Sequence, residues 1–95
     1  MGAIAITGAG SGIGAATRAR LQRAGKRVVG VDVRGAEIAA DLGKASGRAQ
    51  AAREIVSACN GELQGLVLCA GIGPQHGSSP VIVSVNYFGA VDLLD

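Results

Sequence analysis

A glycine-rich segment near the N-terminus has the residue types that bind a pyrophosphate. It runs from Thr7 to Gly14 as TGAGSGIG, between a short apolar run and a stretch with helical spacing. A phosphate must approach backbone N–H groups at the start of a helix, where the helix dipole favours an anion and side chains would obstruct it. In this interpretation Gly8 permits the tight turn. Gly12 then leaves room for the phosphate, and Gly14 lets helix and sheet pack closely.

An acidic residue, Asp32, ends the second apolar run, 18 residues after Gly14. This is near the separation of about 20 residues at which a carboxylate accepts hydrogen bonds from a dinucleotide ribose. A carboxylate would repel a 2′-phosphate, so Asp32 predicts NAD rather than NADP, although Arg34 lies two residues further on. The alternative is that Asp32 only caps the end of its strand.

The motif TGxxxGxG that starts at Thr7 resembles the cofactor turn of the short-chain dehydrogenases/reductases. Three later segments resemble this family in the same order: Asp41-Leu42, Cys69-Ala70-Gly71 and the stretch 85–89 around Asn86. The last two segments are shared by fewer enzymes than the glycine turn is. They resemble a bacterial hydroxysteroid dehydrogenase/carbonyl reductase subgroup. One departure from the wider family is that Leu68 and Cys69 replace two asparagines. The resemblance covers essentially the whole chain.

The resemblance implies an oxidoreductase that moves a hydride between NAD and a secondary alcohol or carbonyl, with a 3-hydroxysteroid as one candidate substrate. It implies that Asp41 and Leu42 contact the adenine, that Ala70 and Gly71 pass near the nicotinamide ribose, and that Asn86 serves a catalytic proton relay. The full cofactor-binding set is Thr7, Gly8, Gly10, Ser11, Gly12, Ile13, Gly14, Asp32, Asp41, Leu42, Ala70 and Gly71, with no metal site.

The proton-transfer residues of the resembled family are missing from these 95 residues. That family uses a tyrosine followed four residues later by a lysine, but the only tyrosine here, Tyr87, is followed by Val91, and both lysines lie upstream. Tyr87 is therefore interpreted as a packed helix residue. The single histidine, His76, lies in a Gly/Ser loop and is interpreted as exposed. The chain alone is expected to lack dehydrogenase activity.

The elements that must position these residues alternate between apolar runs and helical spacing. Strands are expected at 3–6, 27–32, 38–40 and 65–69, helices at 12–24 and 47–58, and a further helix at 81–95. Strands that alternate with helices indicate βαβ units, so we expect the N-terminal half of a Rossmann-type, doubly wound parallel sheet. Its strand order would be 3-2-1-4-5.

Helical periodicity also predicts which face of each helix is buried. For the first helix the inward set is Ile13, Ala16, Thr17, Leu21 and Ala24, with Arg18, Gln22 and Arg23 on the opposite face. For the second helix Ser46 is expected to cap the N-terminus. The inward set of that helix is Ala49, Ala52, Ile55, Val56 and Cys59.

Composition excludes several classes of protein. With 9 Lys+Arg against 7 Asp+Glu, the net charge of +2 is too small for an electrostatic nucleic-acid binder. Apolar residues make up 48 % of the chain, which argues against disorder, yet no run approaches the roughly 20 residues of a membrane span. Two cysteines, Cys59 and Cys69, are interpreted as reduced thiols of a cytoplasmic protein.

The last expected helix stops at Asp95 without a capping residue, so we interpret residues 1–95 as a truncated NAD-binding domain. Strand 65–69 would then present an apolar edge, which predicts self-association or a homo-oligomer. Two other functions remain open, namely a non-catalytic nucleotide-binding or assembly module and a methyltransferase-like half that binds S-adenosylmethionine. The predicted partner is a small alcohol or ketone, and not a nucleic acid or a membrane.

Overall fold

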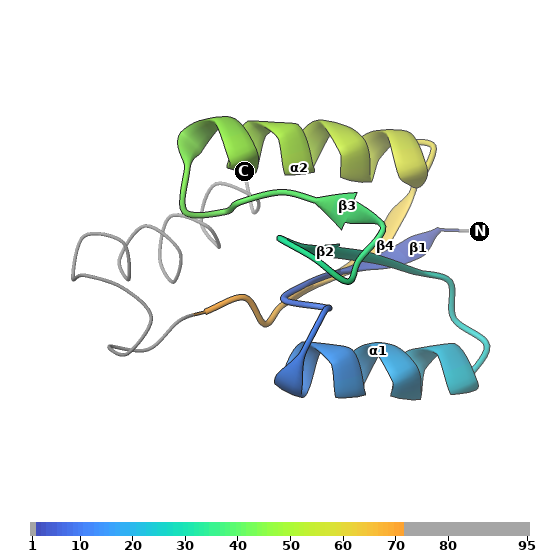
Figure 1. Cartoon of the computed structure of the whole chain (residues 1–95). Coiled ribbons are helices and arrows are strands. Elements are labelled where there is room, and N and C mark those ends of the chain that lie inside the picture. Colours follow the sequence, from blue (N-terminus) through green and yellow to red (C-terminus); the bar gives the residue numbers. More distant parts are fainter. Residues whose placement is uncertain (1, 72–95) are drawn as a thin grey trace.

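Four parallel strands form a sheet with one helix on each face (Figure 1). The computed structural model describes residues 2–71. Their elements are β1 (Ala3–Thr7), α1 (Gly12–Arg23), β2 (Val28–Asp32), β3 (Ile38–Ala39), α2 (Ala45–Ala58) and β4 (Leu63–Leu68). The strand order is β3-β2-β1-β4, as expected for this part of a doubly wound sheet. The fold class and the order of elements predicted for this part of the chain are therefore confirmed.

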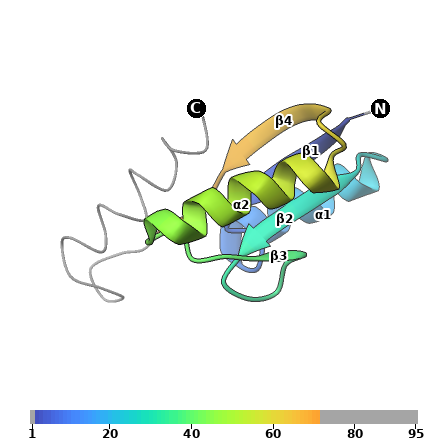
Figure 2. The same cartoon turned by 90° about the horizontal axis from the view of Figure 1, so that it is seen from above.

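Strand β1 lies at the centre, and its two faces differ in residue size. Ala3 and Ala5 belong to the core on the α2 side, whereas Ile6 belongs to the core on the α1 side, with Ile4 packed against it. All of β1 except Ile4 is buried, which explains why its sequence is a continuous apolar run. In the view of Figure 2, α2 crosses over β2 on its way from β3 to β4.

Helix α1 ends one residue earlier than predicted, and its predicted buried face is confirmed only in part, because Leu21 packs against the core whereas Ala16 and Ala24 are exposed. Ile13 is 78 % exposed, and the only buried residue of the helix is Gly14. On this side of the sheet, Leu21 of the helix packs against a core that contains Ile6, with Ile4 beside it. Arg18, predicted to face outward, instead forms an ion pair with Glu37 from the loop before β3.

Helix α2 begins two residues earlier than predicted, and Ser46 is not its cap. Lys44 occupies the N-cap position and makes no side-chain capping bond. The buried residues of the helix are Gly47, Ala51 and Ile55, followed by Cys59 at the C-cap. Of the predicted inward set, Ala49, Ala52 and Val56 are exposed. The predicted stop is confirmed, because Asn60 and Gly61 both take positive φ angles, of 51° and 75°.

Several predictions lie outside the described residues. They concern the helix at 81–95, with Asn86 and Tyr87, and the loop that carries His76. Among residues 2–71, no helix is long and apolar enough to cross a membrane.

Candidate functional site

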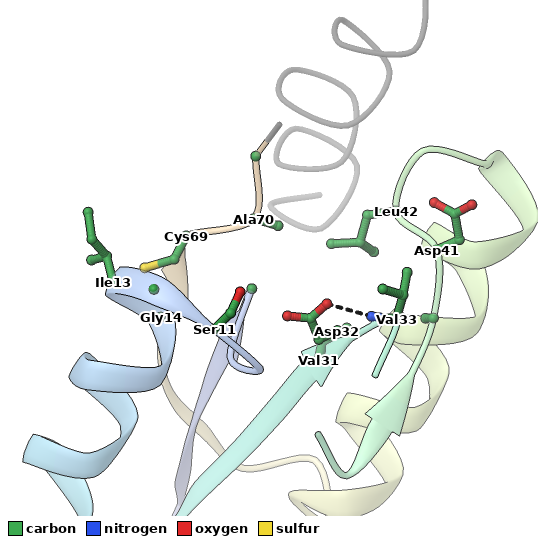
Figure 3. A pocket seen from close by; sticks show the side chains of 14 residues that line it. Ser11, Ile13, Gly14, Val31, Asp32, Val33, Asp41, Leu42, Cys69 and Ala70 are labelled. Carbon is green, nitrogen blue, oxygen red and sulfur yellow. Dashed lines mark hydrogen bonds between the residues drawn. The ribbon is translucent and has the colours of Figure 1, made fainter. Parts of the chain in front are cut away.

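A cavity of about 500 Å³ opens at the carboxyl end of the sheet (Figure 3). This volume lies within the range of about 300–1,000 Å³ that is usual for small-molecule sites. The cavity lies beyond the carboxyl ends of β1, β2 and β4, and doubly wound proteins bind ligands at this edge of the sheet. Its lining comprises Gly8, Ser11, Gly12, Ile13, Gly14, Val31, Asp32, Val33, Ala40, Asp41, Leu42, Cys69, Ala70 and Gly71.

The turn between β1 and α1 forms one wall of the cavity, and its glycines are there for identifiable steric reasons. A Cβ on Gly14 would overlap the carbonyl oxygen of Gly8, so only glycine lets the helix start this close to β1. A Cβ on Gly8 would lie 2.8 Å from the Ala70 nitrogen, and φ at Gly8 is +71°. Gly12 differs, because nothing lies within 4 Å of where its Cβ would be. The open space at the helix start is suited to an anion.

The start of α1 is also electrostatically suited to an anion. The first N–H groups of a helix have no intrahelical acceptor, and they carry the positive end of the helix dipole. Ser11 occupies the N-cap position without a side-chain capping bond, and the first turn contains no acidic residue. Arg20 and Arg23 lie in the last turn, where positive charge complements the other end of the dipole.

Asp32 ends β2 at the middle of the cavity wall (Figure 3). Its Oδ2 accepts a hydrogen bond from the Gly10 N–H at 2.9 Å, and its Oδ1 accepts one from the Val33 N–H at 2.7 Å. The carboxylate therefore joins the glycine turn to the end of β2. This bonding also fits the alternative interpretation, in which Asp32 caps the end of its strand. Each carboxylate oxygen can accept more than one hydrogen bond, so this bonding is compatible with a ribose ligand.

The opposite wall comes from the loop before α2. Asp41 and Leu42 line the cavity there, and the Asp41 Oδ1 accepts a hydrogen bond from the Gly43 N–H at 2.9 Å. A Cβ on Gly47 would overlap the Asp41 carbonyl oxygen, so this glycine fixes how closely the loop approaches the helix. The apolar lining residues Ala40, Leu42 and Val33 offer a surface for a flat ring.

Two residues of the predicted cofactor set, Thr7 and Gly10, do not line the cavity. The Thr7 side chain is 1 % exposed, and its hydroxyl oxygen accepts hydrogen bonds from the Cys69 and Ala70 N–H groups, each at 3.2 Å. It thereby holds the end of β4 against β1. Gly10 packs against the backbone of Arg34 and donates to Asp32. Both residues support the cavity from behind its lining.

Four residues that line the cavity are absent from the predicted set: Val31, Val33, Ala40 and Cys69. The sequence could have identified Val33 as a cavity residue, because this apolar side chain directly follows the acidic residue that ends a strand. It is 58 % exposed, which is unusual for valine. Ile13 was predicted both for the core and for the cofactor site, and the structure places it at the cavity as a second large, exposed apolar side chain.

The two thiols are free and have different environments. Cys69 is half-buried and lines the cavity, whereas Cys59 is buried in the core at the end of α2. Within residues 2–71, no group of three or more His, Cys, Asp or Glu side chains could hold a metal ion.

Comparison with known proteins identifies similar chains. The sequence is 52 % identical, over all 95 residues, to a 3-alpha-hydroxysteroid dehydrogenase/carbonyl reductase from Comamonas testosteroni. The structure matches that of the 3-alpha-hydroxysteroid dehydrogenase from Pseudomonas sp. B-0831 complexed with NADH, with a TM-score of 0.96 and 49 % identity over 98 % of this chain. It also matches a short chain dehydrogenase/reductase from Brucella ovis, with a TM-score of 0.82 and 27 % identity over 98 % of this chain.

These matches confirm the resemblance that the glycine spacing and the later segments predicted. The chain spans 37 % of the Comamonas and Pseudomonas proteins and 52 % of the Brucella protein. No family model matches the chain.

Proposed function

Starting from a chain whose sequence and fold match the short-chain dehydrogenases/reductases, we propose that residues 1–95 form the NAD-binding part of an oxidoreductase. The observation that carries this proposal is the cavity. It combines an open, glycine-lined helix start with a carboxylate, Asp32, at the end of the neighbouring strand. NAD, when bound, supplies hydride transfer to or from the substrate carbon. The protein's contribution is to hold the dinucleotide and to orient its reactive end.

Each wall of the cavity has a separate part in binding. The N–H groups at the start of α1 bind the pyrophosphate, and Gly12 leaves the space that this requires. Asp32 accepts hydrogen bonds from the adenosine ribose and repels a 2′-phosphate, which favours NAD over NADP. Asp41 and Leu42 contact the adenine. Ala70 and Gly71, at the end of β4, lie beside the nicotinamide ribose.

The proposed substrate is a secondary alcohol or the corresponding carbonyl, and a 3-hydroxysteroid is the first candidate. The names of the relatives support this candidate. Asn86, outside the described residues, is proposed to belong to the proton relay. The Tyr-x-x-x-Lys pair does not occur in the 95 residues, so a polypeptide of this sequence is expected to bind NAD without oxidising an alcohol.

Calorimetric titration of the chain with NAD, NADP and S-adenosylmethionine tests the proposal. We expect NAD to bind most tightly, and the same sample to produce no NADH from a secondary alcohol. A folded chain that binds no NAD would contradict the proposal. Preferred binding of S-adenosylmethionine would favour the methyltransferase-like alternative. Oxidation of an alcohol by the chain alone would contradict the proposal that these residues bind NAD without catalysing the reaction.

Self-association is a second part of the proposal. Among the described strands, β4 pairs only with β1, and it carries the apolar residues Leu63, Leu66 and Val67. Within residues 2–71 no strand pairs with the other edge of β4, and an open apolar edge favours pairing between chains. Size-exclusion chromatography should show a dimer or larger species, and a compact stable monomer would contradict this part.

A further inference from the structure

A partly exposed salt bridge links α1 to the loop between β2 and β3. The guanidinium group of Arg18 donates from Nη1 to Oε1 of Glu37 at 2.7 Å and from Nη2 to Oε2, so the contact is bidentate. Glu37 Oε1 also accepts the Gly30 N–H at 2.8 Å. The side chain of Arg18 is 19 % exposed and that of Glu37 is 49 % exposed. Arg18, Glu37 and Gly30 are hereafter called the Arg18–Glu37 clamp.

The sequence of β2 accommodates this clamp. A Cβ on Gly30 would overlap the Arg18 guanidinium and would lie 2.8 Å from the Cβ of Ala9 and 3.1 Å from Glu37 Oε1. A glycine inside a strand weakens it unless another group needs to come close. Here that group is the guanidinium, which passes against the strand to reach Glu37.

The loop at 33–37 is held at both ends. At its start, Asp32 accepts from the Gly10 N–H, and the Arg34 carbonyl and Gly35 pack against Gly10. At its end, the clamp ties Glu37 to α1 and to β2. The loop therefore runs from Asp32, the last residue of β2, past Val33 at the cavity, and it is fixed at both ends. Neither Arg18 nor Glu37 lines the cavity.

We propose that Arg18 and Glu37 are positioning residues, which hold the loop at 33–37 so that the site prefers a dinucleotide with a free 2′-hydroxyl over one with a 2′-phosphate. The inference rests on the proposed function. Its physical reason is that hydrogen bonds from a carboxylate to a ribose depend on placement. A released loop moves Asp32 away from the hydroxyls and frees Arg34 to approach a phosphate.

The experiment measures the affinities of the full chain for NAD and NADP by calorimetry, together with thermal unfolding. The variants are R18M, E37Q and the exchange R18E/E37R. R23M is the matched control, because Arg23 is an exposed arginine in the last turn of the same helix. We expect R18M and E37Q each to weaken NAD binding by about three- to tenfold and to lower the preference for NAD. R23M should leave the NAD affinity and the preference for NAD unchanged. The exchange R18E/E37R should restore part of the NAD affinity that each single variant loses.

The paired variants separate positioning from simple charge. R18M removes a positive charge near the loop and E37Q removes a negative one, so a purely electrostatic effect would change the preference in opposite directions. The inference would be overturned if wild type, R18M and E37Q had the same ratio of NAD to NADP affinity, or if the two variants changed this ratio in opposite directions. In either case, NAD binding by wild type would still uphold the proposed function. Wild type that binds no NAD would overturn both. E37Q keeps the shape of the side chain and its acceptor for Gly30, so it reports even where R18M does not fold.

Discussion

Helices α1 and α2 begin with the same backbone packing but differ in what surrounds it. The third residue of each is a glycine, Gly14 or Gly47, that lies against a backbone carbonyl of the preceding loop. At α1 the preceding turn is glycine-rich, and five residues of the turn and helix start line the cavity. At α2 no helical residue lines the cavity, and the preceding loop presents Asp41 and Leu42 instead.

We propose that the same glycine packing serves two kinds of ligand recognition. Where side chains are absent, the N–H groups of the helix are available to a phosphate. Where the loop carries side chains, as before α2, those side chains are proposed to contact the ligand, and the start of the helix is proposed only to fix the loop. The predictions below test this division of roles. The turn and the start of α1 are proposed to bind the phosphates, and the loop before α2 is proposed to bind the base.

The largest expected effects come from G14A and its counterpart G47A. Each adds a methyl group that overlaps a backbone carbonyl, so each should lower the free energy of unfolding by about 1–3 kcal/mol, measured by urea denaturation. NAD affinity should fall by more than about tenfold in G14A, because the phosphate N–H groups move, and by only about two- to threefold in G47A. Equal losses of NAD affinity would contradict the division.

The next largest effects concern the two carboxylates, in D32N and D41N. D32N removes the charge that favours a free 2′-hydroxyl, so NAD affinity should fall by about tenfold while NADP affinity falls less or rises. D41N should weaken NAD and NADP alike, by about two- to threefold, because the adenine is common to both. Calorimetric titration of both cofactors measures this. If D41N changed the ratio of the two affinities as D32N does, the assignment of the walls would be wrong.

A smaller effect is expected from G12A, with G25A as its matched control. Both glycines have positive φ, +58° and +82°, with nothing within 4 Å of the added Cβ. Each substitution should therefore cost about 1–2 kcal/mol of folding free energy from backbone strain alone. Only G12A should also weaken NAD binding, because its methyl group enters the space proposed for the phosphate. Retention of wild-type NAD affinity by G12A would count against that space.

The smallest effect is a pH dependence on the α1 side. The hydrogen bonds from Arg18 lower the pKa of Glu37 from 4.5 to about 2, with a further contribution from the Gly30 N–H and an opposing one from burial. Because the folded-state pKa is the lower one, this stabilisation is present above about pH 4.5 and is lost as the pH falls towards 2.

The Glu37 carboxylate is half exposed, so solvent screening limits the contribution to about 0.5–1 kcal/mol. The difference in unfolding free energy between wild type and E37Q should therefore shrink between pH 5.5 and pH 2.5. If the difference in unfolding free energy stayed constant over this range, the pKa of Glu37 would not be lowered in the folded protein.

The strands and the cavity were predictable because their signals are local. Continuous apolar runs gave β1, β2 and β4, and the glycine motif gave the turn between β1 and α1. Ten of the twelve predicted cofactor residues line the cavity. Their contact with NAD stays a prediction, as does the role of Asn86.

The buried faces of the helices were predictable from hydrophobicity only in part, through Leu21, Ile55 and Cys59. In α2, alanines occupy both the buried position 51 and the exposed positions 49 and 52, so periodicity does not determine the orientation of the helix. In α1 the one buried residue is a glycine, which no hydrophobic pattern identifies, although the predicted Leu21 does pack against the core. The Arg18–Glu37 clamp joins residues 19 apart and depends on the tertiary fold, although Gly30 inside a strand was a visible sign of a close approach.

The most direct test of NAD binding in this cavity uses the two cysteines. Cys69 lines the cavity, and Cys59, at 3 % exposure, is an internal control. The folded chain is treated with iodoacetamide with and without NAD, and modification of each cysteine is followed by mass spectrometry. We expect Cys69 to react and Cys59 to stay protected, and NAD at ten times its Kd to slow the Cys69 reaction by about tenfold. An unchanged Cys69 rate at saturating NAD would contradict the proposal that this cavity holds the cofactor.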